Sequence, residues 1–188
     1  MLDYQIREIL CDYLDDNYQK IRIMDEIVIG KARADLVAVT DIVTGYEIKS
    51  DADSYTRLPG QIKEYQKYFQ KNYLVVGQRY RHSAATKVPD YWGIICVCEN
   101  ELEGHTDVEV IREAKENPKF AMKWQLRLLW RNELVNIAVS NALPKYSGKK
   151  KKIICDNLLA RIPRKQLEHC VCEEFFERDY TLLSSPFA

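Results

Sequence analysis

Apolar and polar positions recur along the chain with two periods, which predict alternating helices and strands. From Leu2 to Leu14 the apolar residues fall at helical spacing, so we expect a first helix of about four turns. A second helical pattern covers 61–69. Alternating or continuous apolar stretches predict five strands: 21–29, 34–39, 45–49, 73–77 and 92–98.

This order of elements predicts an α/β fold with a helical crossover before Tyr73. A short helical stretch is expected to end near Pro89, and the rest of the chain is predicted to be helical. An apolar stripe covers about 120–143, and Pro163 occupies the expected first position of a final helix. We therefore expect a core over 1–100 and a helical extension over 101–188, packed on the core or following it.

Composition restricts the class of protein. Acids and bases are equal in number, so nucleic-acid binding would require a local basic patch. The six cysteines lack extracellular framework spacing, no secretory signal is visible, and no apolar run is long enough to span a membrane. We expect a cytoplasmic protein with reduced thiols and no membrane partner.

Two acids and a lysine interrupt the second and third predicted strands. Because side chains alternate along a strand, Glu47 and Lys49 should project to one face and Ile48 to the other. Together with Asp35 on the neighbouring strand, they form a set that suits Mg²⁺, which prefers oxygen ligands. The alternative is a solvated surface pair, since exposed Glu/Lys pairs are common.

The pattern of Asp35 followed on the next strand by Glu47-x-Lys49 resembles the core of the PD-(D/E)XK nuclease superfamily, which has the restriction-endonuclease-like fold. Ala34 stands where the motif's proline would be. The block EIKSDADSYTRLPGQIKEYQKYF (47–69) and the later LLWRNEL (128–134) are similar to a group of short bacterial proteins with a nuclease-like N-terminal half.

The resemblance implies a mixed sheet flanked by helices and an Mg²⁺- or Mn²⁺-dependent nuclease. Asp35, Glu47 and the backbone carbonyl of Ile48 would bind the metal, which acts as a Lewis acid and lowers the pKa of its water. Lys49 would position or activate the attacking water and stabilise charge on the phosphate. DNA rather than RNA is the expected polymer, and endonuclease or exonuclease action stays open.

Three further residues are second-tier candidates. Glu26 lies near a position where the resembled group carries an acid, or is an exposed acid near a hairpin. Gln61 and Tyr65 share a helix face and resemble the Gln-x-x-x-Tyr pattern of a recombination-helicase branch, where these residues orient substrate. Alternatively, Tyr65 belongs to the core. Superfamily members often carry a metal-assisting acid on the first helix, but Glu8 falls nearly opposite the apolar stripe and is expected at the surface.

Basic residues outside the motif are candidates for nucleic-acid contact: Arg57, Lys149, Lys150, Lys151 and Lys152. The four lysines precede a predicted helix, where the helix dipole disfavours cations unless a phosphate is present. A solvated basic turn is the alternative. Two other functions stay open for the whole chain: a catalytically silent module that binds nucleic acid or a partner protein, and a junction resolvase, which requires a homodimer.

Overall fold

The computed structural model describes residues 1–100 and 105–178. The first part of the chain forms the elements α1 (Asp3–Asn17), β1 (Arg22–Ile29), β2 (Ala32–Val39), β3 (Val43–Lys49), α2 (Leu58–Tyr68), β4 (Lys71–Gly77), β5 (Gly93–Asn100) and β6 (His105–Arg112). The second part forms α3 (Met122–Gln125), α4 (Arg131–Ser140), α5 (Lys151–Arg161) and α6 (Arg164–Glu177). None of the helices in these described ranges is long and apolar enough to cross a membrane.

The strands form one mixed sheet in the order β1-β2-β3-β4-β5-β6. β1, β2 and β3 pair antiparallel, β4 is parallel to both β3 and β5, and β6 closes the other edge antiparallel to β5. Two parallel strands cannot be joined by a tight turn, and α2 supplies the crossover between β3 and β4. The predicted α/β fold, a mixed sheet flanked by helices, is confirmed.

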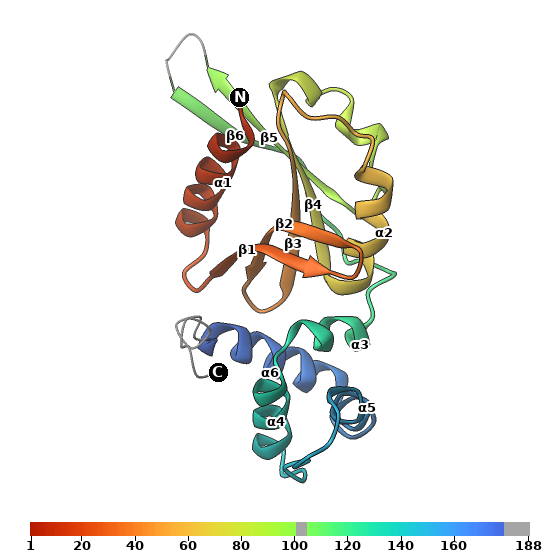
Figure 1. The fold of residues 1–188 in the computed structure, drawn as a ribbon. Helices are drawn as coiled ribbons and strands as arrows, with labels where there is room; N and C mark the ends of the chain where they lie inside the picture. The colour runs from red at the N-terminus through yellow and green to blue at the C-terminus, as the bar shows by residue number, and fades with distance from the viewer. Residues whose placement is uncertain (101–104, 179–188) are drawn as a thin grey trace, which may run out of the picture.

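The two faces of the sheet carry separate hydrophobic clusters. Helix α1 packs on Leu36 and Ala38 of β2 and on Tyr46 and Ile48 of β3. Side chains at odd positions of β2, such as Val37, pack with Leu58 and Tyr65 of α2. Figure 1 shows α1 on one side of the sheet and α2 on the other. The alternation predicted along these strands is therefore realised as two buried layers.

A glycine sets the close approach of α2 to the sheet. A Cβ atom at Gly45 in β3 would lie 2.3 Å from the ring of Phe69 and 2.9 Å from the ring of Tyr65. No side chain fits in that space, so glycine allows the end of α2 to lie directly on β3. This contact places the Tyr65 ring directly against β3, on the α2 side of the sheet.

The predicted boundary at residue 100 does not match the structure, because β6 continues the sheet. β6 pairs with β5, and its residues Val108 and Val110 pack on the α1 side of the sheet. The helices begin only at Met122. The helical stretch expected before Pro89 contains only short 3-10 turns, at Gln78–Tyr80 and Ala84–Thr86.

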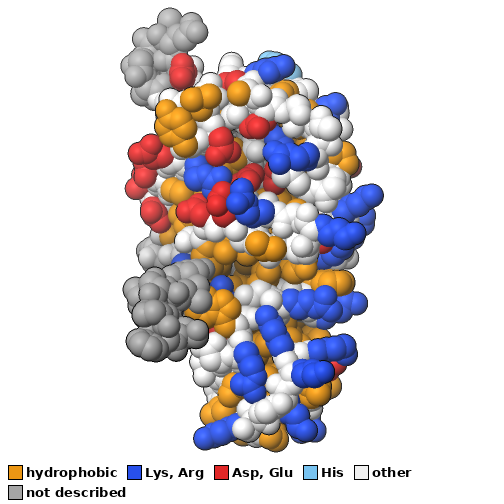
Figure 2. Space-filling view, viewed as in Figure 1, with side chains coloured by type: hydrophobic (Ala, Val, Ile, Leu, Met, Phe, Trp, Pro, Cys, Tyr) orange, Lys and Arg blue, Asp and Glu red, His pale blue; other side chains and the backbone are white. Residues whose placement is uncertain are grey.

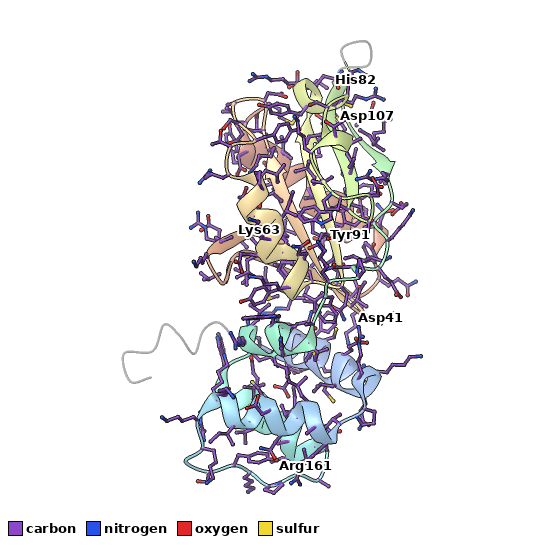
Figure 3. The ribbon with its side chains drawn as sticks, turned by 90° about the vertical axis from the view of Figure 1, so that its right-hand side faces the viewer. Asp41, Lys63, His82, Tyr91, Asp107 and Arg161 are labelled. Atoms are coloured by element: carbon purple, nitrogen blue, oxygen red, sulfur yellow. The ribbon has the colours of Figure 1, made fainter. Side chains whose placement is uncertain are left out.

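The long helix predicted over 120–143 is divided into α3, a 3-10 turn and α4. Trp130 has extended backbone and caps α4, with its N–H donating to Glu133 at 2.5 Å. The same carboxylate forms a buried ion pair with Arg178 at 2.6 Å. These contacts stabilise a break that an uninterrupted apolar stripe does not reveal. The helices lie below the sheet in Figures 1 and 3, and their apolar side chains join the cluster on the α2 side.

Candidate active site

The hydrogen-bonded ladder between β2 and β3 ends at the predicted site. Leu36 and Tyr46 form the last pair toward this end, although both strands continue through the described residues. Beyond it, the hydroxyl of Tyr65 accepts a hydrogen bond from the N–H of Asp35 (3.1 Å) and donates one to the carbonyl of Tyr46 (3.0 Å). A buried tyrosine therefore replaces a ladder hydrogen bond, so both backbone groups stay satisfied where the ladder ends.

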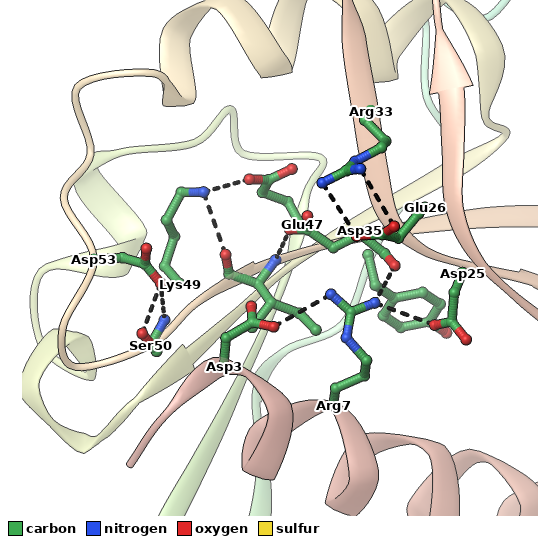
Figure 4. A network of polar contacts seen from close by, with 12 residues as sticks. Asp3, Arg7, Asp25, Glu26, Arg33, Asp35, Glu47, Lys49, Ser50 and Asp53 are labelled. Carbon is green, nitrogen blue, oxygen red and sulfur yellow. Dashed lines mark hydrogen bonds and ion pairs between the residues drawn. The ribbon is translucent and has the colours of Figure 1, made fainter.

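Asp35, Glu47 and Lys49 come together at this end of the ladder, as the sequence predicted. Asp35 Oδ2 accepts a hydrogen bond from the backbone N–H of Ile48 at 2.8 Å. The Lys49 ammonium donates to a carboxylate oxygen of Glu47 and to the Ile48 carbonyl, the latter at 3.2 Å (Figure 4). Three groups expected to bind a metal or act on its water thus form one connected cluster.

Burial dominates the electrostatics of this cluster. The Glu47 side chain is fully buried, and its Oε2 has no hydrogen-bond partner among the described residues. Burial and the nearby Asp35 charge raise the pKa of Glu47 to about 7, although Lys49 acts in the opposite direction. Burial also raises the pKa of Asp35, partly offset by the Ile48 N–H. Paired carboxylates with raised pKa values are typical of functional sites.

The cluster lies beside a cleft of about 900 Å³. Asp35, Ile48 and Lys49 line it from the sheet. The remaining wall comes from α1, the β1–β2 turn, the loop after β3, and α2. Basic side chains outnumber acidic ones on that wall: Lys31, Arg33, Arg57, Lys63 and Lys67 lie there with Asp3, Asp53 and Glu64. A polyanion fits these walls better than a neutral ligand, because basic side chains are in excess along them.

The first helix contributes residues that the sequence analysis missed. Asp3 lines the cleft, whereas Glu8 is exposed as predicted. Arg7 donates to the backbone carbonyl of Asp35 and forms ion pairs with Asp3 (3.3 Å) and Asp25 (3.1 Å) (Figure 4). The four-residue spacing of Asp3 and Arg7 is visible in the sequence, but it does not reveal that the arginine reaches β2.

The second-tier candidates have different surroundings. Gln61 lines the cleft one helical turn before Tyr65, and its buried Oε1 has no hydrogen-bond partner within the described part of the chain. Glu26 is exposed and forms an ion pair with Arg33 at 3.1 Å. The strand register places Glu26 opposite Asp35, with an unusual positive φ of 54°. Its geometry agrees with the exposed-acid alternative.

The four lysines lie at the start of α5, away from the cleft residues. Lys149 and Lys150 are exposed. Lys151 donates to the Arg127 carbonyl at 2.7 Å, and Lys152 pairs with Asp156 at 2.7 Å. Arg57, by contrast, lines the cleft at the start of α2. A role of these residues in binding nucleic acid stays a prediction.

The residues of the cluster fit a hard cation. Two carboxylates and a backbone carbonyl provide oxygen ligands, and the buried Glu47 Oε2 lacks a partner among the described residues. The described residues contain no group of three or more His, Cys, Asp or Glu side chains suited to a metal, so the carbonyl of Ile48 would be needed. The Lys49 ammonium contacts two of these ligand groups, and a bound cation would compete with it.

Replacing Tyr65 by phenylalanine should destabilise the protein, because the Asp35 N–H and the Tyr46 carbonyl lose their shared partner. Leaving such buried groups unsatisfied costs about 1–3 kcal/mol. Urea denaturation measures the loss. Tyr68→Phe is a matched control on the same helix, since no hydrogen bond of the Tyr68 hydroxyl is observed in the described structure. Equal stability of the two variants would contradict the bridging role of Tyr65.

Without metal, the protein should become less stable as the pH rises from about 4.5 to about 7, by the contribution of Glu47. The unfolded chain loses this proton near its ordinary pKa of 4.5, whereas the folded chain holds it until its pKa of about 7. The unfolded state then binds fewer protons in this window, so the free energy of unfolding falls. Glu47→Gln should remove that slope when denaturation is followed in EDTA. Parallel pH profiles would show that Glu47 is not perturbed.

One protein family matches almost the whole chain. The family model described as Bacteriophage P4 protein cII matches residues 2–187, so it covers the sheet and the helical extension together. No curated protein and no solved structure matches the chain. The family description names a phage protein and states no chemistry, so a function has to be argued from the cluster and the cleft.

Proposed function

We propose that the chain, which belongs to the bacteriophage P4 protein cII family, is a metal-dependent nuclease that hydrolyses phosphodiester bonds in DNA. The observation that supports this most is the fully buried Glu47, which is paired with Lys49 and lies near the charge of Asp35, while Asp35 and Lys49 themselves line the cleft. Burying a carboxylate whose second oxygen lacks a partner costs free energy. Such a cost is typical of catalytic sites, where buried carboxylates with shifted pKa values serve the reaction.

Each group has a separate task in the proposed reaction. Asp35, Glu47 and the Ile48 carbonyl would hold Mg²⁺ or Mn²⁺, which supplies Lewis-acid catalysis at the phosphate. Tyr65 keeps Asp35 and Tyr46 at fixed positions through its two hydrogen bonds. Lys49 provides a positive charge beside the carboxylates, where negative charge develops on the phosphate in the transition state. The basic wall of the cleft would hold the DNA backbone.

A cleavage assay with purified protein tests the proposal. Labelled single-stranded, double-stranded and branched DNA are incubated with Mg²⁺, with Mn²⁺ or with EDTA. We expect cleavage with metal and none with EDTA, and the products distinguish endonuclease from exonuclease action. Tight DNA binding without cleavage under any condition would instead identify a catalytically silent binding module. Preference for branched DNA, together with dimers in sedimentation, would favour a junction resolvase.

A further inference from the structure

One stretch of the helical extension is far more basic than the chain as a whole. The full sequence has 28 basic and 28 acidic residues, yet residues 119–166 contain twelve lysines and arginines and only two acids. Both acids are already paired: Glu133 is buried against Arg178, and Asp156 contacts Lys152. On the face seen in Figure 2, the acids are concentrated on the part that contains the sheet, whereas Lys and Arg side chains dominate the helical part below it. The neutral total therefore conceals a strongly basic stretch over 119–166.

Three cations lie over one aromatic ring where the sheet and the helical extension join. Above the ring of Trp124 lie Lys67 from α2 (5.5 Å to the ring centroid), Lys123 from α3 (5.7 Å) and Arg127 (4.2 Å). We call these four residues the Trp124 cluster. Cation–π contacts hold the three charges in place. The ring thus concentrates positive charge at the junction.

The charges in the Trp124 cluster are only partly balanced. Lys67 pairs with Glu64, but Lys123 and Arg127 are exposed and form no ion pair with any described residue. They are four residues apart on consecutive helical turns, where like charges repel. Lys151 brings a further cation to the Arg127 carbonyl. A bound polyanion would relieve this repulsion.

The Trp124 cluster connects two hollows of the surface. Lys67 lines the cleft beside Asp35 and Lys49. Lys123 and Arg127 line a second hollow together with Lys151 and Lys152 at the start of α5. Positive charge is therefore continuous from the candidate active site to the helical extension. Figure 2 shows Lys and Arg side chains along this side of both bodies.

We infer that the Trp124 cluster and the start of α5 bind the phosphate backbone of a nucleic acid that extends out of the cleft. The inference rests on the proposed function for the direction of the strand, and it makes the substrate a polymer longer than the cleft itself. A short oligonucleotide would fill only the cleft. A longer duplex would also contact the helical extension and bind more tightly, mainly through phosphates.

The test is the salt dependence of DNA binding by the full chain. Fluorescence anisotropy in EDTA is measured with labelled duplexes of about 10 and about 30 base pairs, which are one and three helical turns. The variant Lys123→Gln/Arg127→Gln changes two exposed side chains. For the longer duplex, its slope of log affinity against log salt should be shallower by about 1.8, and its affinity near 0.15 M salt lower by on the order of tenfold. The shorter duplex should show a smaller loss.

The control variant Lys71→Gln/Arg164→Gln removes the same charge from a hollow that also contains Glu116 and Glu168. Its salt slope should stay close to that of the wild type. An unchanged slope in Lys123→Gln/Arg127→Gln, or an equal change in the control, would overturn the inference. Stronger competition by polyglutamate than by unlabelled duplex would also overturn it and assign the surface to an acidic protein. Anisotropy in EDTA measures DNA binding alone. Failure of the proposed nuclease activity would therefore appear only in the cleavage assay, whereas a wrong DNA path would appear as an unchanged salt slope.

Discussion

Replacing Asp35 by alanine should abolish DNA cleavage and strongly weaken Mn²⁺ binding. Asp35 lines the cleft and faces the Glu47–Lys49 segment, so its loss leaves one carboxylate and a carbonyl for the metal. Losing one preorganised electrostatic group typically slows a reaction by about 10²–10³-fold, and a metal ligand contributes to binding as well. Cleavage kinetics and titration calorimetry with Mn²⁺ measure the two effects.

Two further variants separate chemistry from folding. Asp35→Asn keeps an oxygen that can accept the Ile48 N–H, so the backbone should stay in place while the charge is lost. Asp25→Asn removes an exposed acid that pairs with Arg7 at 3.1 Å, and it should leave cleavage nearly unchanged. If Asp35→Ala and the wild type bind Mn²⁺ with equal affinity, the metal site is elsewhere.

Replacing Lys49 by methionine should lower the cleavage rate by at least about a hundredfold. Methionine keeps much of the length of the side chain but removes the charge that would stabilise the phosphate in the transition state. Because the ammonium contacts Glu47 and the Ile48 carbonyl, its removal also removes a competitor for the metal. We therefore expect Mn²⁺ binding to be retained and DNA affinity to change only modestly.

The variant also leaves the buried Glu47 without its cation, which destabilises a folded protein unless the carboxylate takes up a proton. Added Mn²⁺ should restore thermal stability, since the metal replaces the missing charge. Lys115→Met, at an exposed lysine that does not line the cleft, is the control and should cut at close to the wild-type rate. Equal rates for Lys49→Met and the wild type would contradict the catalytic assignment of Lys49.

The amino-acid sequence by itself determined the order of the elements from α1 to β5. Each of these segments buries its own apolar positions with a regular period, so the local pattern reports helix or strand directly. It also determined that Glu47 and Lys49 share a face and that Ile48 lies on the other, because alternation is a property of the strand alone. The juxtaposition of Asp35 with these residues followed from two adjacent strands.

Only the tertiary structure decided where the hydrogen-bonded ladder between β2 and β3 ends and which residues surround that end. The Tyr65 hydroxyl bridges Asp35 and Tyr46 because Gly45 lets α2 approach β3, a contact between segments that no local period encodes. The same reason applies to Arg7, which reaches the Asp35 carbonyl from another element.

The helical extension shows the same division. The basic composition of residues 119–166 is a property of the sequence, but the meeting of Lys67 with Arg127 over one ring depends on how α2 and α3 pack. Strand β6 and the break before α4 were likewise set by long-range partners, namely β5 and Arg178. Periodicity reports which positions are buried, whereas packing decides which buried or charged groups meet.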